Sequence, residues 1–438
     1  MFQRINYFNR KLLLLILIIS ILGILIGMAS NRKVSAIADD VYEDLRVFTD
    51  VLTHLQKDYV EETENRTLIY GAIEGMLNTL DPHSSFMRPE VYREMQMETK
   101  GKFEGLGIVI EKKNGLLTVV SPIEDTPAFK AGIQPGDHII KIDGEPTKNI
   151  SLNEAAMKMR GPKGTNVTIT ITREGLAKPK DITIVRDIIP LKSVRHEVLE
   201  KEIGYVRISQ FNEETASDFE KALQKLTVLS KAPLKGLIVD LRNNPGGLLD
   251  QAVKVADKFI TSGVIVSIEG RNKEQKMTFT AHRDGTLENY PLVVLVNGGS
   301  ASGSEILAGA LQDHGRALIL GTQTFGKGSV QTIFPLKDGS GLKLTTARYY
   351  TPDGRSIQAM GITPSIIVPY SEMPEPELKE PPRLPMEKDL EHHLKGLEEP
   401  GEEKEPKERK KKVLDAQLER ALQILKSWEI FQRLSLKK

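Results

Sequence analysis

The apolar pattern of this 438-residue chain begins with an uncharged run over residues 12–30, which follows three basic residues: Arg4, Arg10 and Lys11. The run is about as long as the roughly 20 residues of one membrane crossing. Positive charge on its amino side predicts that this end stays in the cytoplasm and that the rest lies outside the inner membrane, in the periplasm or cell envelope. We therefore predict a membrane anchor in residues 1–38. The alternative is a signal peptide cleaved after Ala36-Ile37-Ala38, which would leave a secreted protein.

Two amphipathic helices are predicted in residues 39–98, because apolar residues recur there at spacings of three and four. The first helix carries Val41, Leu45, Phe48, Leu52, Leu55 and Tyr59. The second ends at Asp81-Pro82 and carries Leu68, Ile69, Ala72, Ile73, Met76, Leu77 and Leu80. We assign this helical amino-terminal region a packing role and no chemistry.

Short β segments dominate residues 99–188. The pattern predicts a helix at 152–159 and strands at 116–120, 138–142 and 167–172. Three motifs follow one another along this stretch: G-L-G-I at 105–108, A-G-I-Q-P-G-D at 131–137 and I-I-K-I-D-G at 139–144. In this order they resemble the motifs of a PDZ domain, and the resemblance covers residues 99–188.

A PDZ domain implies a peptide-binding groove. Its glycine-rich turn would hold a terminal carboxylate with backbone N–H groups, and the next strand would accept the peptide as an added strand. That turn is Gly105, Leu106, Gly107 and Ile108, which by itself would indicate only a tight turn. Arg160 is a candidate for a basic residue that reports an occupied groove, and an ordinary surface arginine is an equally good interpretation.

Residues 203–350 alternate buried strands with helices, which indicates an α/β core. We expect helices at 213–229 and 304–313, and strands at 206–209, 237–241 and 292–296. Residues 371–412 are rich in Pro, Glu and Lys and are predicted to be a solvated linker. Residues 413–438 form a predicted amphipathic helix that docks on the body or on another subunit, through Val413, Leu414, Leu418, Ala421, Leu422, Leu425 and Trp428.

The first candidate for chemistry is the N-G-G-S-A-S-G-S-E block at 297–305, between a predicted strand and a predicted helix. A serine at such a junction is exposed at the sheet edge, where amides and the helix dipole can stabilise an oxyanion. Ser302 competes with Ser300 and Ser304, of which Ser304 is expected to cap or start the helix. A Ser-His-Asp site lacks support, because no histidine lies in a second motif.

The second candidate is the G-T-Q-T-F-G-K-G-S block at 321–329. It nearly spells a phosphate-binding P-loop, but Gly328 stands where that loop needs Ser or Thr, and residues 329–334 are β-like. The alternative is that Lys327 is a general base. Burial would lower the pKa of its amine, and the neutral amine could take the proton of Ser302.

Together, the S-A-S-G-S-E block at 300–305, the F-G-K-G block at 325–328, the D-L-R-N-N-P-G-G stretch at 240–247 and the PDZ motifs resemble the carboxyl-terminal processing peptidases. These tail-specific serine proteases form family S41. The resemblance runs from about residue 40 to residue 370. It implies a multidomain protein with a crotonase-like α/β protease core at 189–370 and an inserted PDZ domain.

The resemblance also implies roles for individual residues. Ser302 would be the nucleophile and Lys327 the general base, oriented by Gln331. The oxyanion hole would use the amide of Gly303 and one from the turn at Gly246 or Gly247. Asp313 matches an acidic position that is linked to activity in part of the family.

The net charge of +1 argues against nucleic acid as the main partner. The chain has no cysteine, so disulfides and thiolate chemistry are excluded. The resemblance implies protein or peptide substrates with apolar carboxyl ends in the envelope or outside the cell, and no cofactor or metal. Two alternatives are an anchored PDZ scaffold with an inactive core and an enzyme of another class on the same fold. The sequence leaves open whether the protein forms a homo-oligomer or needs an adaptor.

Overall fold

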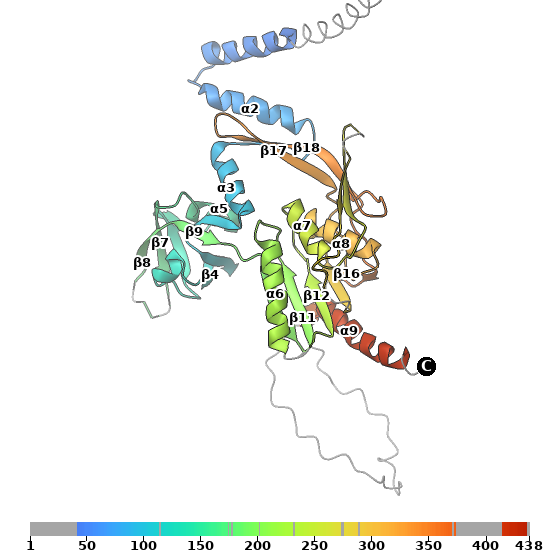
Figure 1. Cartoon of the computed structure of the whole chain (residues 1–438). Coiled ribbons are helices and arrows are strands. Elements are labelled where there is room, and N and C mark those ends of the chain that lie inside the picture. Colours follow the sequence, from blue (N-terminus) through green and yellow to red (C-terminus); the bar gives the residue numbers. More distant parts are fainter. Residues whose placement is uncertain are drawn as a thin grey trace, which may run out of the picture. The chain divides into compact units, whose positions relative to one another are not determined.

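The computed structural model describes residues 42–369, 372–373 and 414–435, except 114, 174, 177, 201, 231–232, 273–275 and 288–289 (Figure 1). The chain divides into two compact units, one up to Phe86 and one from Met87 onward. The predicted anchor at 1–38 and most of the predicted linker at 371–412 lie outside the described residues. Over the residues that are described, no helix is long and apolar enough to cross a membrane.

The first unit contains the two predicted helices. One covers residues 42–58, and the other is α2 (Asn65–Asn78), which begins three residues earlier than the apolar pattern indicates. The carboxylate of Asp81 accepts hydrogen bonds from the backbone N–H groups of His83 and Ser84, at 2.8 and 2.9 Å. This turn follows the end of α2, as the Asp-Pro pair predicts.

The second unit begins with α3 (Pro89–Thr99) and continues into an antiparallel sheet with two helices, α4 (Pro127–Lys130) and α5 (Leu152–Met159). The strands of this sheet are β3 (Ile108–Lys113), β4 (Leu116–Pro122), β5 (His138–Ile142), β6 (Glu145–Pro146), β7 (Asn166–Thr172) and β8 (Lys180–Val185). Helix α5 has the predicted bounds, because a capping box between Ser151 and Glu154 fixes its start. In the sequence, β2 (Lys102–Gly105) precedes the strands of this PDZ-like sheet and β9 (Asp187–Pro190) follows them. The two strands pair with each other.

The core is a largely parallel sheet, which confirms the predicted α/β class. Its order is β10-β11-β12-β15-β16-β19, with only β10 antiparallel to its neighbour. Every residue of β12 and β15 is buried. The bounds are β10 (Val194–Leu199), β11 (Ile203–Ile208), β12 (Gly236–Asp240), β15 (Leu292–Val296), β16 (Leu318–Gly321) and β19 (Ile366–Ile367).

The buried strands carry apolar side chains on both faces, so both faces need a cover. Val239 and Val294 belong to the larger cluster, which includes apolar residues of α6 (Thr215–Ser230), α7 (Leu249–Asp257) and α8 (Gly303–Asp313). Ile238 and Val293 belong to a second cluster, completed by residues of α9 (Ala416–Ser435).

Helix α9 therefore docks on the body of its own chain, the first of the two predicted alternatives. Leu422 and Leu425 are buried against the sheet. Gly236 makes room for this contact, since a Cβ atom there would lie 3.0 Å from a methyl carbon of Leu425. The carboxyl-terminal helix is thus a structural part of the α/β core.

A second, antiparallel sheet includes β13 (Val264–Gly270), β14 (Met277–Thr280), β17 (Ser329–Pro335) and β18 (Gly341–Tyr350). Strand β17 confirms the β-like segment expected after Lys327. Its pairing with β18 places Gln331 opposite Thr345 and Ile333 opposite Lys343. The lysine block therefore ends in a sheet and does not open a helix, as a P-loop would.

Candidate active site

Ser302 lies between β15 and α8, in a strained backbone conformation. Its φ of 53° and ψ of −112° fall where residues other than glycine are rare. The sharp turn joins the end of a buried strand to the first turn of a helix, and the Ser302 residue remains 9% exposed. Such strain concentrates at functional positions, including strand-to-helix turns that carry a nucleophilic serine.

The two competing serines have structural contacts instead. The Ser300 hydroxyl donates to the Leu241 carbonyl at 2.8 Å, and the Ser304 hydroxyl donates to the Asn244 carbonyl at 2.9 Å. Both side chains are fully buried. Ser304 is the second residue of α8, so it lies at the start of the helix, one of the two positions expected for it, and Ser302 occupies the N-cap position.

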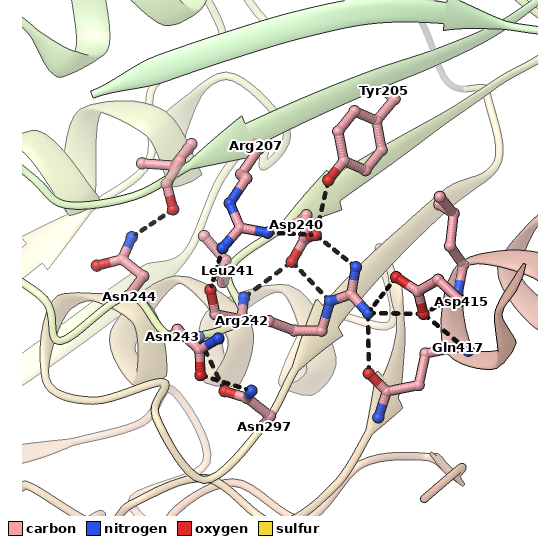
Figure 2. A network of polar contacts seen from close by, with 12 residues as sticks. Tyr205, Arg207, Asp240, Leu241, Arg242, Asn243, Asn244, Asn297, Asp415 and Gln417 are labelled. Atoms are coloured by element: carbon pink, nitrogen blue, oxygen red, sulfur yellow. Dashed lines mark hydrogen bonds and ion pairs between the residues drawn. The ribbon is translucent and has the colours of Figure 1, made fainter. Parts of the chain in front are cut away.

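The D-L-R-N-N-P-G-G stretch at 240–247 packs directly against this serine loop (Figure 2). The backbone carbonyl of Asn244 accepts the N–H of Ala301 at 3.0 Å. A Cβ atom on Gly246 would lie 2.8 Å from the Cβ of Ser302, so only glycine fits there. Asn244, whose importance the sequence did not reveal, joins the two loops.

The hydrogen bonds of Gly246 and Gly247, the two turn glycines proposed for the oxyanion hole, differ. The N–H of Gly246 donates to the Asn244 side chain at 2.9 Å. Among the described residues, the N–H groups of Gly247 and Gly303 have no hydrogen-bond acceptor. These two amides are therefore the ones available to a ligand beside Ser302.

Lys327 lies in the loop between β16 and β17. The neighbouring Phe325 N–H donates to the Ser300 carbonyl at 3.0 Å, which ties the loop to the serine block. Burial, followed by repulsion from Lys343, lowers the pKa of Lys327, although Glu305 acts in the opposite direction. No hydrogen bond between the Ser302 hydroxyl and the Lys327 amine occurs in the described part of the chain.

A buried carboxylate joins the two loops. Glu305, in the first turn of α8, is fully buried, and its Oε2 accepts the backbone N–H of Ser302 at 2.8 Å and that of Lys327 at 2.9 Å. Its Oε1 accepts the N–H of Gly326 at 2.7 Å and the hydroxyl of Thr324 at 2.6 Å. Nothing in the sequence marks Glu305 for this role, because an acidic residue in the first turn of a helix is common for its favourable charge alone.

The Gln331 amide donates to the hydroxyls of Ser329, at 2.9 Å, and Thr345, at 3.3 Å. Within the described residues it makes no hydrogen bond to Lys327. Its role in orienting the lysine stays a prediction.

Asp313 ends α8, eleven residues after Ser302, so it lies roughly 16 Å along the helix axis from the serine. It pairs with Arg355 and accepts the N–H of Asp353 at 3.0 Å. The segment that it holds continues to Gln358, whose side chain accepts the N–H of Gly328, beside Lys327, at 3.1 Å. Asp313 can therefore affect the lysine loop without contacting the reacting atoms.

The PDZ-like sheet has a small cavity of about 120 Å³ beside the predicted carboxylate-binding turn. Its lining includes Gly105 to Ile108, Phe103, Met159 and Arg160. Gly107 has a φ of 79°, and a Cβ atom there would lie 2.4 Å from Thr126, so glycine is required. Arg160 bonds Glu94 and Glu98 of α3 at 2.5 and 3.0 Å, which means that it is not an unpaired surface arginine.

His314, the histidine nearest to Ser302 in the sequence, has a structural contact. His314 follows α8, and its Nε2 lies 2.7 Å from the carbonyl oxygen of Val264, to which it donates. Across the described residues, no group of three or more His, Asp or Glu side chains could hold a metal ion.

Comparison with known proteins identifies similar families and relatives. Residues 202–368 match peptidase family S41, residues 118–173 a PDZ domain, and residues 27–91 the amino-terminal domain of the activating protease CtpB. The carboxy-terminal-processing protease of Bartonella bacilliformis is 51% identical over 364 residues, which cover 82% of each chain. Bacillus subtilis CtpB is 39% identical over 80% of this chain and 74% of its own. The solved photosystem II D1 C-terminal processing protease is 32% identical with a TM-score of 0.44, over 74% of this chain and 86% of that one.

Proposed function

Because this chain belongs to peptidase family S41, the carboxy-terminal processing serine proteases, we propose that it cleaves polypeptides with a Ser-Lys dyad. Ser302 is the nucleophile of this dyad and Lys327 its general base. The observation that carries the proposal is the shared Oε2 of Glu305, which holds the backbone N–H groups of both residues.

The proposed reaction follows from these positions. Neutral Lys327 takes the proton of the Ser302 hydroxyl as its oxygen bonds to the scissile carbonyl carbon. The N–H groups of Gly303 and Gly247 stabilise the negative oxygen of the tetrahedral intermediate. The lysine then gives its proton to the leaving amine, the carbon–nitrogen bond breaks, and water hydrolyses the resulting ester by the same route.

We propose that the hydrogen bond between the Ser302 hydroxyl and the Lys327 amine forms when a substrate binds. Catalytic hydrogen bonds are often long or misaligned in the free state and tighten in the substrate complex. We assign the reorientation of Gln331 toward Lys327 to the same transition, since its amide is otherwise engaged by Ser329 and Thr345.

We assign substrate selection to the PDZ domain. Backbone N–H groups of the turn from Gly105 to Ile108 would hold a terminal carboxylate, and the cavity beside it takes an apolar last side chain. Arg160 lines this cavity and is paired with Glu94 and Glu98. An arriving carboxylate would compete with this acidic pair, which supports Arg160 as the residue that reports an occupied groove.

The proposed substrates are envelope or secreted proteins. The motivation is the run at 12–30 with basic residues before it, which would anchor the protein in the inner membrane with its catalytic part outside the cytoplasm. Fractionation of cells should leave the full-length protein in the membrane pellet. A soluble mature protein that begins at Asp39 would show signal-peptide cleavage instead.

The test of the dyad compares the purified full-length protein with three variants: Ser302→Ala, Lys327→Ala and Lys327→Arg. Each variant should lose proteolysis while keeping its fold, and the arginine variant should be inactive because arginine cannot become a neutral base. Full activity of either lysine variant would contradict the assignment.

The test of selection uses one reporter peptide with an apolar end as free acid, as amide and with a charged extension. Equal cleavage of all three would reject carboxyl-end recognition.

A further inference from the structure

Asp240, at the end of β12, is the centre of a buried polar network (Figure 2). Its side chain is fully buried, and it accepts hydrogen bonds from the Tyr205 hydroxyl at 2.7 Å and from the guanidinium of Arg242 at 2.7 and 3.0 Å. Burial, with Asp240 beside it, raises the pKa of Tyr205 to about 12, so its hydroxyl remains a donor at neutral pH. The network therefore holds Arg242, which lies within the 240–247 turn, by charged contacts.

The other side of Arg242 is held by the carboxyl-terminal helix. Its Nη1 lies 2.7 Å from Oδ2 of Asp415, and it also donates to Gln417 at 3.1 Å. The Arg242 side chain is only 7% exposed. Asp415 and Gln417 lie 173 and 175 residues further along the chain. A buried guanidinium needs each of its partners, because removal of one leaves uncompensated charge.

Gln417 extends the same contact to the lysine loop. Its amide donates to the carbonyl of Val368 at 2.7 Å, and the Val368 N–H donates to the carbonyl of Gly321 at 2.8 Å. Gly321 ends β16 and begins the loop that carries Lys327. The start of α9 thus contacts the segments that lead into both the glycine turn and the lysine loop.

We propose that Asp415 and the first turn of α9 that follows it position the active site, with Asp415 as a positioning residue that acts on the oxyanion turn through Arg242. The inference rests on the proposed function, because it assumes that Gly247 in this turn supplies an oxyanion donor. Asp415 itself contacts no reacting atom. Its contribution should therefore be to the transition state and leave substrate binding unchanged.

Asp415→Asn separates this role from helix capping. Oδ1 of Asp415 accepts the N–H groups of Gln417 and Leu418, both at 3.1 Å, and asparagine caps a helix equally well. The substitution keeps that cap and removes the charge paired with Arg242. Glu419→Gln is the matched control, because it removes one carboxylate from the first turn of α9, which directly follows Asp415.

For Asp415→Asn we expect kcat to fall about tenfold with KM unchanged, less than the roughly 10²–10³-fold loss that follows removal of an oxyanion donor. A peptide boronic acid, which forms a tetrahedral adduct with a nucleophilic serine, should bind more weakly by the same factor. The uncleaved product peptide should bind equally well. Asp415→Ala should lose more, since the cap is lost too, and Glu419→Gln should match the unmodified protein.

The single tryptophan of the chain, Trp428, lies on α9 and is half exposed, so its emission reports whether the helix stays docked. Asp415→Asn should keep the emission of the unmodified protein. Two results would overturn this inference and leave the dyad assignment intact. One is an activity loss that occurs only together with a red shift of the Trp428 emission. The other is equal kcat and equal boronate affinity in Asp415→Asn and Glu419→Gln. An unmodified enzyme that cleaves the reporter without forming a boronate adduct, with Ser302→Ala still active, would overturn the dyad and this inference together.

Discussion

Replacement of Glu305 by glutamine should reduce both stability and catalysis, because one buried carboxylate accepts four hydrogen bonds from the loops that carry Ser302 and Lys327. Glutamine has nearly the same shape but replaces one acceptor oxygen by an NH₂ donor. With the NH₂ at the position of Oε2, the N–H groups of Ser302 and Lys327 both lose their acceptor. With the NH₂ at the position of Oε1, only the Gly326 N–H loses its acceptor. The Thr324 hydroxyl can rotate and accept a hydrogen bond from the NH₂ instead.

The second orientation costs less free energy, because it leaves only one N–H group without an acceptor. It therefore sets the expected loss of stability. A buried N–H without an acceptor costs about 1–3 kcal/mol. The remaining hydrogen bonds also weaken, because bonds to a charged acceptor are roughly twice as strong as neutral ones. We expect the free energy of unfolding to fall by about 2–4 kcal/mol, since the lower desolvation penalty of the neutral side chain offsets part of the loss.

Measurements of catalysis separate the effect of the Glu305 charge from the effect of its side-chain length. Its negative charge raises the pKa of Lys327 against the effects of burial and Lys343. Glu305→Gln removes that charge, so the pKa of Lys327 should fall further and the acid limb of kcat/KM should move to lower pH. Glu305→Asp keeps the charge but is one methylene too short to reach both loops. It should lower kcat without this pH shift, by about 10²-fold for a displacement near 1 Å.

The assay is urea denaturation together with pH profiles of kcat/KM on a peptide with a free apolar carboxyl end. Glu419→Gln, a glutamate-to-glutamine change at a half-buried position of α9, serves as the control for both measurements. Unchanged stability and an unchanged acid limb in Glu305→Gln would refute the reasoning. A shift of the limb to higher pH would refute the electrostatic part alone.

Three further predictions concern neighbouring residues. Lys343→Gln removes a like charge that lowers the pKa of Lys327, so the acid limb of kcat/KM should move to higher pH, opposite to Glu305→Gln. Gly246→Ala places a methyl group 2.8 Å from the Cβ of Ser302 and should lower kcat/KM by about 10²-fold or more, measured on the same peptide. Asp313→Asn loses its ion pair at the end of α8 and should lower the free energy of unfolding by about 1–3 kcal/mol, whereas unchanged urea denaturation would show that the pair contributes nothing.

Elements with a strong local signal were predictable from the sequence. Strand β15 and helix α5 have the predicted bounds, 292–296 and 152–159, because each has both an apolar pattern and a clear boundary residue. Helix α7 and strand β18 were not predicted. The buried apolar side chains of α7 fall within one or two turns, and β18 finds its partners β13 and β17 through tertiary pairing.

The candidate site likewise has residues that the sequence reveals and residues that it does not. Ser302 and Lys327 stand in glycine-rich blocks that are visible in the sequence, because tight turns need glycine. The partners that hold those blocks were not visible. Glu305 looks like an ordinary acidic residue at a helix start, and Asp415 lies 173 residues from the arginine that it contacts.

The positions of these partners follow from the sheet. Strands β12, β15 and β16 are parallel neighbours, so the loops at 241–247, 297–302 and 322–328 meet at one edge, where functional sites of parallel sheets are found. Irregular loops cannot satisfy one another with regular backbone ladders, and their buried N–H groups need other acceptors. A carboxylate can accept several N–H groups at once, as Asp240 and Glu305 do. Apolar packing alone could not fix these loops, which explains why charged residues are buried beside the proposed catalytic serine and lysine.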